Sequence, residues 1–169
     1  NIPNIKIEKP IRLIELFSGY SSQAMAMKRI GADFAVWHTG EWLWQSNRSH
    51  LAVFHNNECS DYTKDMSFDD VVNAILKLGV SADEQKPMTE AEVRRKGEQW
   101  CRRVYSEFRE NRNLGSICNI HGADLEITDT DKYDYMMTYS FPCVTEDTLI
   151  LIKDGYKEMC DVEVGDVVL

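Results

Sequence analysis

The order of hydrophobic and polar residues predicts alternating strands and helices in the first part of the chain. Residues 11–17 form a nearly continuous apolar run, typical of a strand buried on both faces of a parallel sheet. A polar turn follows at 18–22, and apolar side chains recur at helical spacing over 23–30. A second strand is expected at 34–38 and a second helix at 43–54. This alternation predicts an α/β fold with a mostly parallel sheet.

Charged, helix-forming sequence interrupts the alternation between about residues 56 and 122. Within it lie two capping-box patterns, each predicting a helix start: Ser67 with Asp70, and Thr89 with Glu92. The second helix is expected to run to about Arg109. This region contains no recognisable site, so we interpret it as a helical insertion that packs against the sheet. Strand character returns at 133–141.

The last residues differ from the rest in pattern and in charge. Short strands are expected at 149–152 and 162–169, with a turn of Asp-Gly type at 154–155 between them. Residues 143–169 contain seven acidic and only two basic side chains. We therefore place a domain boundary at Cys143, which divides the chain into residues 1–142 and 143–169.

Charge and composition restrict the function classes. The chain of 169 residues has 28 acidic and 19 basic side chains, a formal net charge of −9, so it lacks the cationic surface that unaided nucleic-acid binding requires. No apolar run approaches the roughly 20 residues of a membrane span, so no membrane partner is expected. Because the chain starts at Asn1 and stops within a strand pattern at Leu169, it is expected to be a fragment.

The cysteines indicate a reducing compartment. They are odd in number, widely spaced and without a C-x-x-C pair, and no signal-peptide pattern precedes them, which predicts reduced thiols in an intracellular protein. Cys59 lies near His50 and His55 in the sequence, but without the paired ligand spacing of a zinc site, so no metal is expected. Structural roles are expected for four of the five: Cys59, Cys101, Cys118 and Cys160.

The turn after the first strand is a candidate ligand site. In open parallel sheets, ligands bind beyond the carboxyl ends of the strands, where the first turn supplies backbone amides at a helix N-terminus. Gly19 permits close backbone approach there, and Glu41, after the second strand, can accept hydrogen bonds from ribose hydroxyls. On these features alone, a nucleoside-cofactor site and an ordinary tight turn both remain open.

Four segments in order resemble motifs of the DNA cytosine-5 methyltransferases. Residues 15–26 (ELFSGYSSQAMA) are similar to the first motif, whose pattern is F-x-G-x-G, and residues 139–143 (YSFPC) are similar to the catalytic Pro-Cys motif. Residues 40–42 (GEW) resemble the second motif and residues 122–125 (GADL) the third. The similarity covers residues 11–142 and implies a Rossmann-like domain that binds S-adenosylmethionine.

The resemblance also implies roles for individual residues. Ser21 stands where the family pattern has its second glycine, so a left-handed backbone at Ser21 would be strained. The alternatives left open are a solvated Glu41, a core Trp42 and a loop Asp124. The implied cofactor contacts are Phe17 beside the adenine, the amides of Gly19, Tyr20, Ser21 and Ser22 near the methionine moiety, Glu41 on the ribose hydroxyls, Trp42 on the adenine face and Asp124 at the adenine amino group.

The methyltransferase pattern stops at Cys143, where a second resemblance begins. Residues 143–150 (CVTEDTLI) are similar to the first block of an intein, and residues 161–169 (DVEVGDVVL) to a second block. This implies a partial all-β, Hint-like segment. In an intein, Cys143 would be the splicing nucleophile that attacks the carbonyl of Pro142 in an N-to-S acyl shift. The methylation nucleophile would then be a different, downstream cysteine, and Cys143 would serve in methylation only if there is no intein.

Together the resemblances imply a precursor fragment of a DNA cytosine-5 methyltransferase, interrupted by an intein that begins at Cys143. DNA is the implied partner of the complete spliced enzyme, and a complementary C-terminal half is the implied partner of this chain. By itself the fragment is expected neither to methylate nor to splice. Two alternatives remain open: a non-catalytic cofactor-binding module with an inert tail, and an RNA cytosine methyltransferase.

Overall fold

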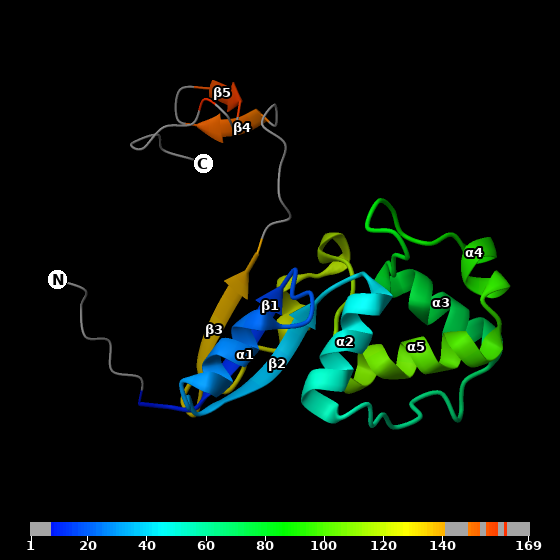
Figure 1. The fold of residues 1–169 in the computed structure, drawn as a ribbon, viewed down its shortest axis with the longest axis horizontal. Coiled ribbons are helices and arrows are strands. Elements are labelled where there is room, and N and C mark those ends of the chain that lie inside the picture. Colours follow the sequence, from blue (N-terminus) through cyan, green and yellow to red (C-terminus); the bar gives the residue numbers. More distant parts are fainter. Residues whose placement is uncertain (1–7, 141–148, 153–154, 159–160, 162–169) are drawn as a thin grey trace.

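The computed structural model describes residues 8–140, 149–152, 155–158 and 161. Three parallel strands form a sheet in the order β2-β1-β3: β1 (Ile11–Leu16), β2 (Phe34–Gly40) and β3 (Asp134–Tyr139). Helix α1 (Ser22–Arg29) connects β1 to β2 and lies over the sheet (Figure 1). The predicted α/β fold with a parallel sheet is confirmed, and this arrangement is compatible with a Rossmann-like core.

The central position of β1 explains its apolar sequence. Leu13 and Ile14 point to opposite faces of the sheet, and both are almost completely buried. Glu15 is buried as well, and its Oε1 accepts a hydrogen bond from the Ala24 backbone N–H at 3.0 Å. A central strand covered on both faces therefore carries one carboxylate that anchors the start of α1.

The insertion is helical, as predicted, and has its own hydrophobic core. It follows α2 (Trp44–His55) and contains α3 (Phe68–Leu78), α4 (Glu90–Arg95) and α5 (Glu98–Glu110). Both predicted capping boxes are present, at the starts of α3 and α4. The core lies mainly between α3 and α5, and includes Val71, Val72, Ile75, Val93, Cys101, Val104 and Phe108.

One helix prediction in the insertion is wrong. A single helix from Thr89 to about Arg109 was expected, but the chain breaks between α4 and α5. Gly97 has φ of 85° at the break and forms the N-cap of α5. Only glycine adopts this conformation without strain, so Gly97 turns the chain while Val93 and Val104 stay in one core.

The chain returns from the insertion along the edge of β2. Thr39 N–H donates to the Arg112 carbonyl at 3.3 Å, and Leu114 N–H donates to the Thr39 carbonyl at 2.8 Å. Two short 3-10 helices follow, η1 (Ile117–Asn119) and η2 (Gly122–Leu125), before β3. The segment after α5 therefore pairs with β2 at one isolated parallel bridge, between Thr39 and Asn113, near the carboxyl end of that strand.

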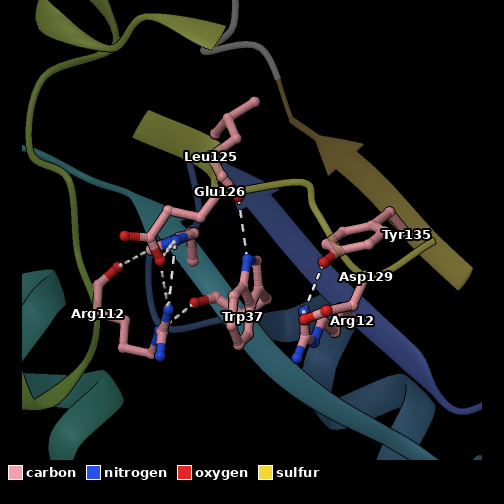
Figure 2. A network of polar contacts seen from close by, with 8 residues as sticks. Arg12, Trp37, Arg112, Leu125, Glu126, Asp129 and Tyr135 are labelled. Atoms are coloured by element: carbon pink, nitrogen blue, oxygen red, sulfur yellow. Dashed lines mark hydrogen bonds and ion pairs between the residues drawn. The ribbon is translucent and has the colours of Figure 1, made fainter. Parts of the chain in front are cut away.

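Two arginines hold the returning segment to the sheet (Figure 2). The guanidinium carbons of Arg12 and Arg112 lie 3.7 Å and 3.9 Å from the ring centroid of Trp37. Arg12 forms an ion pair with Asp129 and Arg112 one with Glu126, both at 3.1 Å. Because each cation also has a carboxylate partner, the stack of guanidinium, indole and guanidinium is electrostatically balanced.

The described tail residues form a two-stranded antiparallel hairpin of β4 (Leu149–Ile152) and β5 (Gly155–Glu158). The strand predicted at 149–152 is confirmed, and β5 begins at the predicted turn glycine, Gly155. The strand expected at 162–169 and the boundary at Cys143 lie outside the described residues. In the part of the chain that the structure describes, no helix is long and apolar enough to cross a membrane.

Candidate functional site

A cavity of about 520 Å³ lies at the carboxyl ends of β1 and β2. Four of the predicted cofactor residues line it: Phe17, Gly19, Glu41 and Trp42. A volume of this size is within the range of sites for small molecules and cofactors. The remaining lining residues come mostly from the insertion and from the segment that returns from it: Gly40, Ser46, Glu84, Gln85, Gly115, Ser116, Ile117, Cys118 and Ser140.

The loop after β1 has three residues in the left-handed backbone region. Phe17, Gly19 and Ser21 have φ of 53°, 53° and 66°. A Cβ added at Gly19 would meet no atom within 4 Å, so Gly19 is required for its backbone conformation and not for lack of space. The expectation for Ser21 is realised, because its φ and ψ of 66° and 58° place a non-glycine residue in a conformation that costs about 1–2 kcal/mol.

Glu41 closes the loop against the start of α2. Its Oε2 accepts a hydrogen bond from the Gly19 N–H at 2.9 Å, and its Oε1 accepts one from the Leu43 N–H at 2.7 Å. Burial raises the pKa of Glu41, these two amides oppose the rise, and the nearby Glu84 carboxylate adds to it. Each carboxylate oxygen has a second lone pair, so Glu41 can still accept hydrogen bonds from ligand hydroxyls.

Asn113 holds the backbone of Glu41 in place. Its Oδ1 accepts from the Glu41 N–H at 3.1 Å and from the Gly115 N–H at 2.9 Å. Its Nδ2 donates to the Glu41 carbonyl at 3.0 Å and to Asn47 Oδ1 at 2.9 Å. These contacts involve residues far apart in the chain, and no local sequence pattern marks Asn113 as part of the site.

The structure does not bring all the predicted site residues into the cavity. Tyr20 is 59% exposed, and neither Tyr20 nor Ser22 lines the cavity. Ser21 is completely buried and does not line the cavity either. Asp124 is also absent from the lining, because its Oδ2 accepts from the His121 N–H at 2.7 Å at the start of η2. Pro142 and Cys143 lie outside the described residues.

The other cysteines have different environments. Cys101 is completely buried in the insertion core, which agrees with its predicted structural role. Cys59 and Cys118 are exposed, so neither contributes to a core, and Cys118 lines the cavity instead. Among the described residues, no group of histidine, cysteine or acidic side chains is arranged to hold a metal ion. Cys160 lies outside the described part of the chain.

Acid is expected to destabilise the protein through His50. Burial lowers the pKa of His50 to about 4, from 6.5. Between these pH values the unfolded chain binds more protons than the folded protein. The free energy of unfolding therefore decreases as the pH is lowered. The full loss attributable to His50 is roughly 3 kcal/mol, and most of it is reached by pH 4.5. Urea denaturation at pH 7, 5.5 and 4.5 measures it.

The matched control for this pH dependence is His50→Gln. Burial raises the pKa values of Glu15 and Glu41, which therefore stabilise the folded protein as the pH falls. Because both proteins contain these carboxylates, the difference between wild type and His50→Gln isolates the histidine. Equal pH dependence in the two proteins would contradict the prediction.

Comparison with known proteins does not assign the chain to a family. It matches no model of a protein family, and a search of curated proteins finds no significant match. The function is therefore inferred from the residues and the geometry of the cavity.

Proposed function

We propose that residues 1–142 are the S-adenosylmethionine-binding part of a DNA cytosine-5 methyltransferase, and that an intein begins at Cys143. The observation that carries the proposal is the hydrogen bond from the Gly19 N–H to Glu41 Oε2 at the strand ends. It joins the residues of the first two motif-like segments across one cavity. Such a site, beyond the carboxyl ends of parallel strands, is the usual place for a nucleoside ligand in this kind of fold.

The cavity has chemical groups that suit the nucleoside part of this cofactor. Trp42 and Phe17 offer aromatic surface for the adenine ring, and Glu41 offers carboxylate oxygens for the ribose hydroxyls. The loop amide that lines the cavity, the Gly19 N–H, donates to Glu41 Oε2, so it holds the ribose acceptor in place. When bound, S-adenosylmethionine supplies an electrophilic methyl group, and the residues of this chain hold and orient it.

Methylation and splicing would use different cysteines. Carbon 5 of cytosine becomes nucleophilic only after a thiolate adds to carbon 6, and the base must first leave the duplex. In splicing, Cys143 Sγ forms a bond to the Pro142 carbonyl carbon, the peptide C–N bond breaks, and the released nitrogen takes the proton. The downstream cysteine joined to Pro142 after splicing would then be the methylation nucleophile.

Cofactor binding is tested by titrating the full chain with S-adenosylmethionine in a calorimeter. Glu41→Ala is expected to weaken binding by about 30-fold, because it removes the ribose acceptor and frees the Gly19 and Leu43 amides. Glu90→Ala, at the exposed start of α4, is the matched control and should bind as wild type does. A wild-type chain that binds neither the cofactor nor its demethylated product would refute the proposed site.

A further inference from the structure

Ser21 is held by a buried contact that the proposed cofactor chemistry does not use. Ser21 is completely buried, and its Oγ lies 2.7 Å from Nδ1 of His50, which is 2% exposed. Ser21 belongs to the loop after β1, whereas His50 lies on α2, so the contact joins the loop to a helix that follows β2 in the chain. It is made by the one serine that adopts the left-handed conformation in this loop.

The surroundings of His50 favour its neutral form. Its ring packs against Phe54, with 4.7 Å between the ring centroids. The centroid of the His55 ring, on the same helix, lies 6.0 Å from that of His50. Burial is the main cause of its low pKa, and the charge of His55 lowers it further. A neutral imidazole has one N–H donor and one acceptor nitrogen, so it can form a directed hydrogen bond with a hydroxyl without burying a charge.

Glu15 is a second buried polar side chain near Ser21. Burial raises the pKa of Glu15, and the Ser21 hydroxyl opposes the rise by stabilising the carboxylate. Glu15 Oε2 has no hydrogen bond of ordinary geometry among the described residues. A hydroxyl has one proton and two lone pairs, so the Ser21–His50 contact can form with the imidazole nitrogen either as donor or as acceptor.

We propose that His50 is a positioning residue for the cofactor loop, and that its hydrogen bond holds Ser21 in the left-handed conformation that glycine would adopt freely. The inference rests on the proposed cofactor site, because the positioned loop contains the Gly19 amide. The hydrogen bond offsets the conformational cost at Ser21, and the two are of similar size. Serine and histidine together thus replace the second glycine of the family pattern.

The test is a double-mutant cycle between positions 21 and 50, read by affinity for S-adenosylmethionine. His50→Ala is expected to weaken binding about tenfold, and Ser21→Ala by a similar factor, because alanine keeps the Cβ but loses the hydrogen bond. Ser21→Gly should bind within threefold of wild type. In the Ser21→Gly background, His50→Ala should cost less than twofold, because glycine needs no partner.

A purely structural role for His50 gives a different pattern. His50→Ala would then weaken binding by the same factor in the wild-type and Ser21→Gly backgrounds, and that result would overturn the inference. His50→Asn, which retains an N–H donor, should recover part of the affinity. The urea concentration at the unfolding midpoint can be measured without ligand. His50→Ala should lower this midpoint at most half as much in the Ser21→Gly protein as in the wild type. A wild-type chain that fails to bind refutes the proposed function, while the midpoint cycle still decides the role of His50.

Discussion

Mixing the full chain with a complementary C-terminal intein half and dithiothreitol is expected to release residues 1–142, and Cys143→Ala is expected to abolish the release. The thiol exchanges with the thioester that Cys143 forms with Pro142, so cleavage requires the Cys143 sulfur. Mass spectrometry of the intact mixture measures both products. The effect is all or none, because alanine has no nucleophile to begin the acyl shift.

Cys101→Ala is the matched control for this cleavage. It removes a thiol that is buried in the insertion core and should leave the release of residues 1–142 unchanged. An uncleaved wild-type chain under every condition would contradict the intein assignment. Cofactor binding without cleavage would favour the cofactor-binding module with an inert tail.

Gly115→Ala is expected to destabilise the protein by more than about 4 kcal/mol or to prevent folding. A Cβ added at Gly115 would lie 2.1 Å from the Leu78 carbonyl oxygen, and the φ of 82° is itself unfavourable for alanine. The same carbonyl accepts a hydrogen bond from the Ser116 N–H at 2.7 Å, so it cannot move away without losing that bond. Urea denaturation measures the change, and Gly115 also lines the cavity, so cofactor binding should be lost with it.

Gly97→Ala separates the two causes of this effect. Gly97 has φ of 85°, almost the same as Gly115, but a Cβ there would meet nothing within 4 Å. Alanine at position 97 therefore has only the conformational cost of φ 85° and ψ 159°, about 1–3 kcal/mol. If both substitutions lowered the free energy of unfolding equally, the close approach of position 115 to Leu78 would contribute nothing to the effect.

Local patterns predicted the main strands and helices of this fold, but not strand β5, the two 3-10 helices or the break between α4 and α5. The alternation of strand and helix, and the two capping boxes, depend on residues within a few positions of each other, and all are present. The break at Gly97 depends on whether α4 and α5 pack into one core at an angle. Helical periodicity continues on both sides of it, so the pattern alone favoured one long helix.

Some contacts of the candidate site were likewise predictable from the sequence, and others were not. Gly19 and Glu41 follow consecutive strands of a parallel sheet, so their meeting at the strand ends was predictable from topology. Asn113 and Ile117 reach the site only because the chain returns along β2 after a long insertion. Asp124 caps a 3-10 helix instead of lining the cavity, and short helices of this kind have weak sequence signals.

The contacts of Asn113 have a consequence for folding. Its side chain bonds to Glu41 after β2, to Asn47 on α2 and to Gly115 beyond α5, so a single amide group connects the end of β2, the helix that precedes the insertion and the segment that returns from it. Local opening of the insertion would therefore release Glu41 and with it the Gly19 amide. By thermodynamic linkage, a ligand bound at the strand ends must protect helices that it does not touch. The insertion is thus part of the same cooperative unit as the cavity.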